Sequence, residues 1–267
     1  MKRGHILVAG FLLLALTRTA FADESRGEAA APLAPAPDRL GYQVESGVAS
    51  TYVFRGRPQY TDRRDASSQS TAALTWKQVG SGDASFTAWN ATALTTAHSQ
   101  PGTATEIDLT ANYAYTVADT IATNAGYIAY LYPNHLSDQH FDGAHELYMA
   151  ASLPNKYVTP SVGVYGELVR LRGTYTTAGL SRTFEVKSFT FTPATSIGMA
   201  AYEGTPTRMN DLSAMFTSQW SFAAPAYVNL RLAYSYMGGR AADLPGQNGS
   251  FSGRSAPWGM VAFGLSR

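Results

Sequence analysis

The sequence contains no cysteine among its 267 residues. A chain without cysteine has neither a disulfide framework nor a thiol nucleophile, so both are excluded. Charged residues are also scarce and balanced, since 20 basic and 19 acidic residues make up 15% of the chain. Nucleic-acid binding needs a basic surface, and this balance therefore argues against a nucleic-acid partner.

Long apolar runs are rare as well, and the most prominent one lies at the N-terminus. Two basic residues precede an apolar stretch over residues 6–16, and Ala20-Phe21-Ala22 places small residues where a signal peptidase would cleave. The stretch is shorter than the roughly 20 residues that a spanning helix requires. We therefore predict a cleaved signal peptide at residues 1–22 and export from the cytoplasm.

The rest of the chain divides into a short leader and one long domain. Residues 23–40 are rich in alanine and proline and show no periodicity, which is typical of a flexible leader. Residues 41–267 have a uniform composition, which predicts a single domain. Removal of residues 1–22 takes away three basic residues and no acidic one, leaving 17 basic and 19 acidic residues, a net charge of −2.

The predicted domain is built from segments in which apolar and polar residues alternate. In residues 106–117 the odd positions are Ile, Leu, Ala, Tyr, Tyr and Val, whereas the even positions include Glu, Asp, Thr and Asn. Residues 227–238 follow the same rule with the opposite parity. A period of two indicates β-strands. Segments of about ten residues or more exceed ordinary soluble strands and match tilted strands that cross a bilayer.

Twelve such segments can be counted, and the gaps between them alternate between short and long. The predicted strands are 41–55, 67–78, 84–95, 105–117, 120–132, 144–153, 157–170, 174–185, 188–202, 208–220, 227–238 and 257–266. Short turns on one side and long loops on the other are typical of outer-membrane barrels. We predict an all-β fold, a transmembrane antiparallel up-and-down β-barrel of twelve strands in the outer membrane of a Gram-negative bacterium. Lipid and lipopolysaccharide would surround it. A soluble all-β secreted protein is the structural alternative.

Aromatic residues near the strand ends are predicted to form the two girdles that such barrels place at the membrane interfaces. The stretch TYVFRG at residues 51–56 would end the first strand, with its rings facing outward at the outer interface. Three further aromatic residues would face the periplasmic interface. The predicted girdle residues are Tyr52, Phe54, Trp76, Tyr115 and Trp220.

Charged residues on the polar faces of the strands are predicted to line the lumen. They either pair with one another and plug the barrel, or form a mixed-charge constriction that filters solutes. The predicted lumen-lining residues are Glu45, Arg55, Glu106, Asp108, Glu167 and Arg231.

One loop combines imidazole and carboxylate side chains, the residue types that bind Zn, Ni or Cu. The stretch HLSDQHFDGAHE contains His135, His140 and His145, which we predict as a metal site. A solvated polar loop without metal is the alternative. A calcium loop that starts at Asp138 is rejected, because its twelfth position is Met149 and not the required glutamate.

Three pieces of the first half carry a resemblance to a known family. STYVFRGRPQ resembles the opening of a family of uncharacterised proteobacterial proteins marked by Y-V-F-R-G-x-S-Q, and EIDLTANY and GYIAYLYP are similar to later strands of that family. The likeness covers about residues 47–132 and departs at Pro58, where the family has serine. The resemblance implies an exported, barrel-like protein and carries no known activity.

From these features we predict a narrow passive channel for small hydrophilic solutes, without a cofactor. A structural or adhesive barrel that acts through its outer loops is one alternative. A membrane-embedded hydrolase is another; it would need a serine or threonine nucleophile beside a histidine, and no G-x-S-x-G motif occurs in the sequence.

Overall fold

The computed structural model describes the strands and many of their connections. The described residues are 39–59, 66–94, 104–133, 143–169, 172–203, 207–238 and 255–267. No helix within these ranges is both long and apolar enough to cross a membrane.

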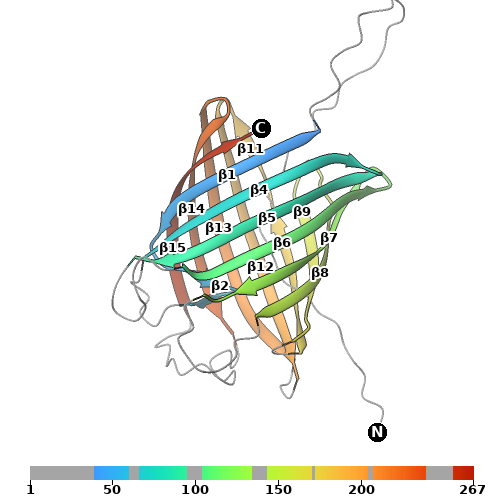
Figure 1. Ribbon diagram of the computed structural model, residues 1–267, viewed down its shortest axis with the longest axis vertical. Helices are drawn as coiled ribbons and strands as arrows, with labels where there is room; N and C mark the ends of the chain where they lie inside the picture. Colours follow the sequence, from blue (N-terminus) through green and yellow to red (C-terminus); the bar gives the residue numbers. More distant parts are fainter. Residues whose placement is uncertain are drawn as a thin grey trace, which may run out of the picture.

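The chain forms one closed antiparallel barrel of twelve strands, which confirms the predicted fold class. The barrel strands are β1 (Leu40–Ala49), β4 (Ser67–Val79), β5 (Gly82–Ala93), β6 (Ala104–Val117), β7 (Ile121–Leu131), β8 (Ala144–Ser152), β9 (Thr159–Glu167), β10 (Gly173–Ser181), β12 (Phe189–Tyr202), β13 (Arg208–Ala223), β14 (Ala226–Met237) and β15 (Ser255–Ser266). Each strand pairs with its neighbour in sequence, and the first pairs with the last, so that β1 and β15 lie side by side (Figure 1).

Two short additions complete the sheet structure. β11 (Phe184–Val186) extends the sheet beside β12, next to the position where β10 also joins β12. β2 (Val53–Phe54) and β3 (Arg57–Pro58) form a separate small hairpin after β1.

The alternating sequence pattern becomes an outer and an inner surface. Large apolar side chains point outward and are exposed in the isolated molecule, for example Met149 at 66% and Val261 at 57%. Polar and small side chains point inward, because successive residues of a strand face opposite sides of the sheet. Apolar exposure of this kind around a closed sheet fits a surrounding of lipid.

The shortest strand connections lie at one end of the barrel and the longest at the other. At the first end β4 and β5 are joined through residues 80–81, and β13 and β14 through residues 224–225. At the other end the connections include residues 50–66 and 238–254. We name these the periplasmic and outer ends, following the pattern of outer-membrane barrels.

The first strand differs from its prediction. β1 ends at Ala49, and Ser50 still pairs with Gly259 through two hydrogen bonds, one of 2.8 Å between the backbones and one of 3.0 Å to the serine hydroxyl. The chain then leaves the wall. The side chain of Tyr52 is 5% exposed and packs on inward-facing residues of β5, and residues 51–56 lie inside the barrel.

Candidate functional site: a hairpin across the lumen

The hairpin of residues 53–58 crosses the barrel from one wall to the opposite one. It is tied at its base by a hydrogen bond from the Gln59 amide to the Tyr52 carbonyl, 2.9 Å long. Its turn is formed by Arg55 and Gly56, whose φ angles of 49° and 76° are both left-handed. Arg55 contacts side chains of β8, β9 and β10. In the ring, β9 is six places from β1 in either direction, so this contact is diametrically opposite the hairpin's origin.

The tip is held by an ion pair between Arg55 and Glu146 of β8. The Nη1 and Nη2 atoms of Arg55 donate to Oε1 and Oε2 of Glu146 over 2.8 and 2.6 Å. The two side chains are only 11% and 4% exposed. The hydroxyl of Tyr130 donates a third bond to Glu146, 2.7 Å long. A bidentate pair of this kind is strong and directional, and loss of one partner from a buried pair costs about 3–5 kcal/mol.

Three aromatic rings surround the same guanidinium group. The Cζ atom of Arg55 lies 4.5 Å from the ring centroid of Tyr175, 4.7 Å from Phe54 and 5.3 Å from Tyr165. Each ring face attracts a cation, and the attraction grows where water is excluded. The rings therefore hold the charged tip in place together with Glu146.

The turn is also bound through its backbone to β13. The side-chain amide of Asn210 donates to the Arg55 carbonyl over 3.1 Å and to the carboxylate of Asp211 over 2.9 Å. The hydroxyl of Tyr175 donates to the same carboxylate. Gly56 packs directly against Asp211, so closely that a Cβ at residue 56 would overlap the Cβ of Asp211. Only glycine fits this contact, and glycine also adopts the left-handed φ freely.

The base of the hairpin is anchored by its own aromatic residues. The ring of Tyr52 lies 5.1 Å from that of Trp89, over the small residues Ala91 and Ala93. The ring of Phe54 meets that of Tyr130 edge-on at 5.9 Å. The expectation that Tyr52 and Phe54 belong to the outer aromatic girdle is therefore wrong. The ring of Tyr52 is buried and that of Phe54 is half-buried inside the lumen, because inward aromatic and alanine residues of the wall offer an apolar surface there.

Trp76, Tyr115 and Trp220 face outward near the periplasmic ends of their strands, and their membership of an aromatic girdle stays a prediction. Their side chains are 43%, 40% and 45% exposed.

Arg182 also lies near this end, between β10 and β11, and its guanidinium carbon is 4.7 Å from the ring centroid of Phe184.

Two of the predicted lumen residues lie next to the hairpin base. Glu106 and Asp108 occupy inward positions two residues apart on β6, close to the side chain of Tyr52. Glu106 is 5% exposed. The Oδ1 atom of Asp108 is one of the buried side-chain atoms in the described residues that has no hydrogen-bond partner.

Glu167 lies at the outer end of β9. It accepts hydrogen bonds from the backbone amides of Val169, 3.0 Å away, and Arg172, 2.8 Å away. Glu167 thus holds the connection between β9 and β10 and is 7% exposed.

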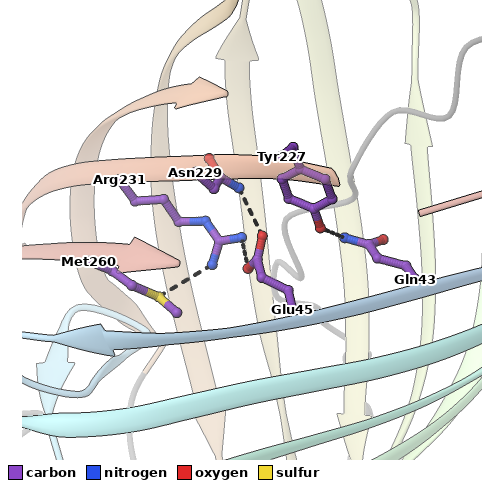
Figure 2. A network of polar contacts seen from close by, with 6 residues as sticks. All are labelled: Gln43, Glu45, Tyr227, Asn229, Arg231 and Met260. Atoms are coloured by element: carbon purple, nitrogen blue, oxygen red, sulfur yellow. Dashed lines mark hydrogen bonds and ion pairs between the residues drawn. The ribbon is translucent and has the colours of Figure 1, made fainter. Parts of the chain in front are cut away.

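A second network lies on the wall where β1, β15 and β14 meet (Figure 2). Arg231 of β14 donates to Glu45 of β1 over 2.5 Å, and Asn229 donates to the other carboxylate oxygen over 3.1 Å. Arg231 also approaches the sulfur of Met260 on β15 at 3.5 Å. Figure 2 shows these side chains pointing toward one another over the sheet. The Arg231 side chain remains 25% exposed, whereas that of Glu45 is 4% exposed.

Two further contacts lie on the same wall, closer to the periplasmic end. Gln43 donates to the hydroxyl of Tyr227 over 2.9 Å, and the Tyr227 ring lies on Gly264. A hydrogen bond and a ring contact thus continue the network of Arg231 and Glu45 along the barrel wall.

The inward surface carries more acidic than basic side chains. The inward carboxylates of the described strands include Glu45, Asp83, Glu106, Asp108, Glu146, Glu167, Glu185 and Asp211, and the inward cations of these strands and the hairpin tip include Arg55, Lys77, Arg208 and Arg231. Arg55, Lys77 and Arg231 are each paired with one of these carboxylates. The surplus charge of the described lumen is therefore negative.

The predicted metal site lies mostly outside the described residues. His135 and His140 belong to the range 134–142, which the structure does not describe. His145 faces outward from β8, where its Nδ1 atom is hydrogen-bonded to the hydroxyl of Tyr127 and the two rings stack at 5.8 Å. The described residues contain no group of three metal-binding side chains. The metal site stays a prediction.

Sequence reasoning missed the partners of the hairpin. Glu146, Asp211 and the inward tyrosines of β7 to β10 form its docking surface; Glu146 was noted only as the last residue of the histidine-rich stretch, and Asp211 and the tyrosines were not singled out. A signal was present in the alternation, because Tyr130, Tyr148 and Tyr165 occupy polar-face positions toward the outer ends of their strands. Tyrosines on an inward face indicate a filled lumen at that level.

Comparison with known proteins gives matches of fold only. No protein-family model and no curated protein sequence matches the chain. Among solved structures, the KdgM porin in complex with disordered oligogalacturonate is similar with a TM-score of 0.50 at 8% identity, covering 85% of this chain and 99% of the porin. An outer-membrane channel from Pseudomonas putida F1 is similar with a TM-score of 0.50 at 11% identity, covering 87% of this chain and 97% of the channel. The fold is that of an outer-membrane β-barrel.

Proposed function

We propose that this outer-membrane barrel is a narrow passive channel for small hydrophilic solutes. The observation that carries the proposal is the lining of the closed barrel. In the middle and the periplasmic half of the lumen, small polar side chains are half-buried, among them Thr71, Thr87, Asn112, Ser196 and Thr217. Such side chains can exchange hydrogen bonds with water and with solutes, which is how a polar pore lowers the barrier to passage.

The channel is proposed to be narrow because side chains fill the outer half of the lumen. There the hairpin lies among the buried rings of Tyr130, Tyr165 and Tyr175, and the inward residues of β8 change from half-buried Ser152 and Ala150 to buried Tyr148 and Glu146. We propose a constriction at this level, with a wider vestibule below it on the periplasmic side.

The charge of the lining suggests the chemistry of the solutes. Carboxylates outnumber cations on the described inward surface, and fixed charges in a pore raise the local concentration of oppositely charged ions. We propose neutral and cationic molecules as solutes. The KdgM structure contains oligogalacturonate, a carboxylate polymer, which the acidic lining of this barrel would repel.

Two measurements on the refolded protein test the channel function. Planar bilayer recording should show discrete conductance steps, and liposomes containing the protein should swell in neutral sugars up to a size limit. A folded barrel that passes neither ions nor sugars contradicts the proposal and favours a structural or adhesive role. The hydrolase alternative lacks support in the described residues, where His145 is paired with Tyr127 and not with a serine or threonine.

A further inference from the structure

We infer that Arg55 determines both the width and the charge of the constriction. The inference rests on the proposed channel function. Arg55 is the one side chain of the hairpin tip that is ion-paired to the far wall among the described residues, and its carbonyl also accepts the bond from Asn210. The hairpin stays across the lumen as long as this residue is docked.

The docking contacts with β8, β9 and β10 converge on the Arg55 side chain, whereas the contacts with β13 are made by the Arg55 carbonyl and Gly56. The guanidinium group is bound by Glu146 through two hydrogen bonds and lies among the rings of Phe54, Tyr165 and Tyr175. Because the hairpin contains only the two-residue strands β2 and β3, it has little pairing of its own to hold it in position. Loss of the guanidinium therefore releases the tip from β8, β9 and β10.

Release of the tip changes the lumen in two ways. The backbone that spans the ring moves away from the far wall, so the narrowest section widens. Glu146 loses its cation, which adds a negative charge to a lining that already carries surplus carboxylates. The released channel should therefore conduct more current and prefer cations more strongly than the wild type.

The second arginine–glutamate pair of the lumen provides a matched control. Arg231 and Glu45 are also ion-paired, and removal of Arg231 changes the charge of the lining by the same amount. Both residues, however, belong to strands of the wall, which are held by β15 between them. Loss of Arg231 thus alters charge without releasing any segment from the lumen.

The experiment compares wild type, Arg55→Ala and Arg231→Ala in planar bilayers and in liposome swelling. The folded state is checked by the heat-dependent shift in gel mobility. Both variants should move the reversal potential under a salt gradient toward cation preference. Only Arg55→Ala should raise the single-channel conductance and the size limit for sugars. Equal conductance of Arg55→Ala and wild type, or an equal rise in Arg231→Ala, would overturn the inference.

A second variant removes the same ion pair from the wall. Glu146→Gln also frees the tip but leaves Arg55 unpaired, so conductance should rise while the reversal potential moves toward anions. This opposite sign separates release of the hairpin from a change of charge alone, and it replaces Arg55→Ala if that variant does not fold. A conductance unchanged by Glu146→Gln contradicts the inference.

The outcomes also separate the inference from the proposed function. If wild type conducts and the two tip variants do not differ from it in conductance, the channel stands and the role of Arg55 falls. If wild type passes no current and Arg55→Ala does, the hairpin blocks the lumen. This result supports the inference, and the wild-type barrel is then closed. If wild type and the variants are all silent, both proposals are wrong.

Discussion

Replacement of Gly56 by alanine tests the position of the hairpin through a single methyl group. Gly56 has a φ of 76°, and an added Cβ would overlap the Cβ of Asp211 and lie 3.3 Å from its Cγ. Gly80, in the turn between β4 and β5, offers a matched control. Its φ is 64°, but a Cβ there would meet only the hydroxyl of Tyr113 at 3.7 Å, an ordinary contact.

The two substitutions share one energetic cost and differ in another. A left-handed backbone costs alanine about 1–2 kcal/mol relative to its preferred conformations. Alanine also lowers the conformational entropy of the unfolded chain, which offsets about 0.4–1 kcal/mol of this cost. Gly80→Ala should therefore destabilise the barrel by ~1 kcal/mol. Gly56→Ala carries the same cost plus overpacking of about 1–3 kcal/mol, because the clash is with a Cβ held close to the backbone of β13.

The extra strain in Gly56→Ala can be relieved without unfolding the barrel. The hairpin needs only to leave Asp211, so the strain should appear as undocking rather than as a loss of wall stability. We expect urea unfolding in lipid vesicles to show similar midpoints for both variants. Single-channel conductance should rise in Gly56→Ala and stay near wild type in Gly80→Ala. Equal conductance in the two variants, with both barrels folded, would refute the placement of the turn against β13.

The remaining predictions concern the two faces, the topology and the metal site. Leu230→Glu, on the lipid face, should destabilise the barrel by up to about 2–4 kcal/mol in urea unfolding, whereas Arg231→Gln should still insert; the reverse result would invert the faces. A tag at Asn155 should be hidden from antibody on intact cells and one at Val169 exposed, and labelling of Asn155 from outside would contradict the topology. Calorimetry with Zn should show binding that is lost when the three predicted histidine ligands in 135–145 become alanine, and equal heats would exclude the site.

The strands were predictable because one face of each strand is apolar and faces lipid, whereas the other faces the polar lumen, and this gives an alternating sequence. Residues 106–117 alternate without interruption, and β6 spans Ala104–Val117, so the pattern located both faces and both ends to within a few residues. The alternation of short and long gaps predicted which connections lie together. Both signals come from local residue order and need no knowledge of what a side chain contacts.

The hairpin could not be predicted in this way. Tyr52 and Phe54 continue the outward parity of Val48, and an aromatic ring fits either an interface with lipid or an apolar surface inside the lumen. The choice depends on residues far away in the chain, since Arg55 and Glu146 are 91 positions apart and Arg231 and Glu45 are 186 apart. A single sequence shows that such residues are charged but not which of them meet.

The proposed constriction occupies a short section of the barrel, and its length determines how passage would depend on the solute. On β8 the buried inward positions are Glu146 and Tyr148, about 7 Å apart along the strand, and on β9 they are Gly163, Tyr165 and Glu167, which span about 13 Å. Resistances along a pore add in series, so nearly all of the resistance would fall within this short section. A molecule from the medium would meet that section first, and the vestibule behind it would equilibrate with the periplasm. Transit rate would then depend on fit at one level and only weakly on the length of the barrel.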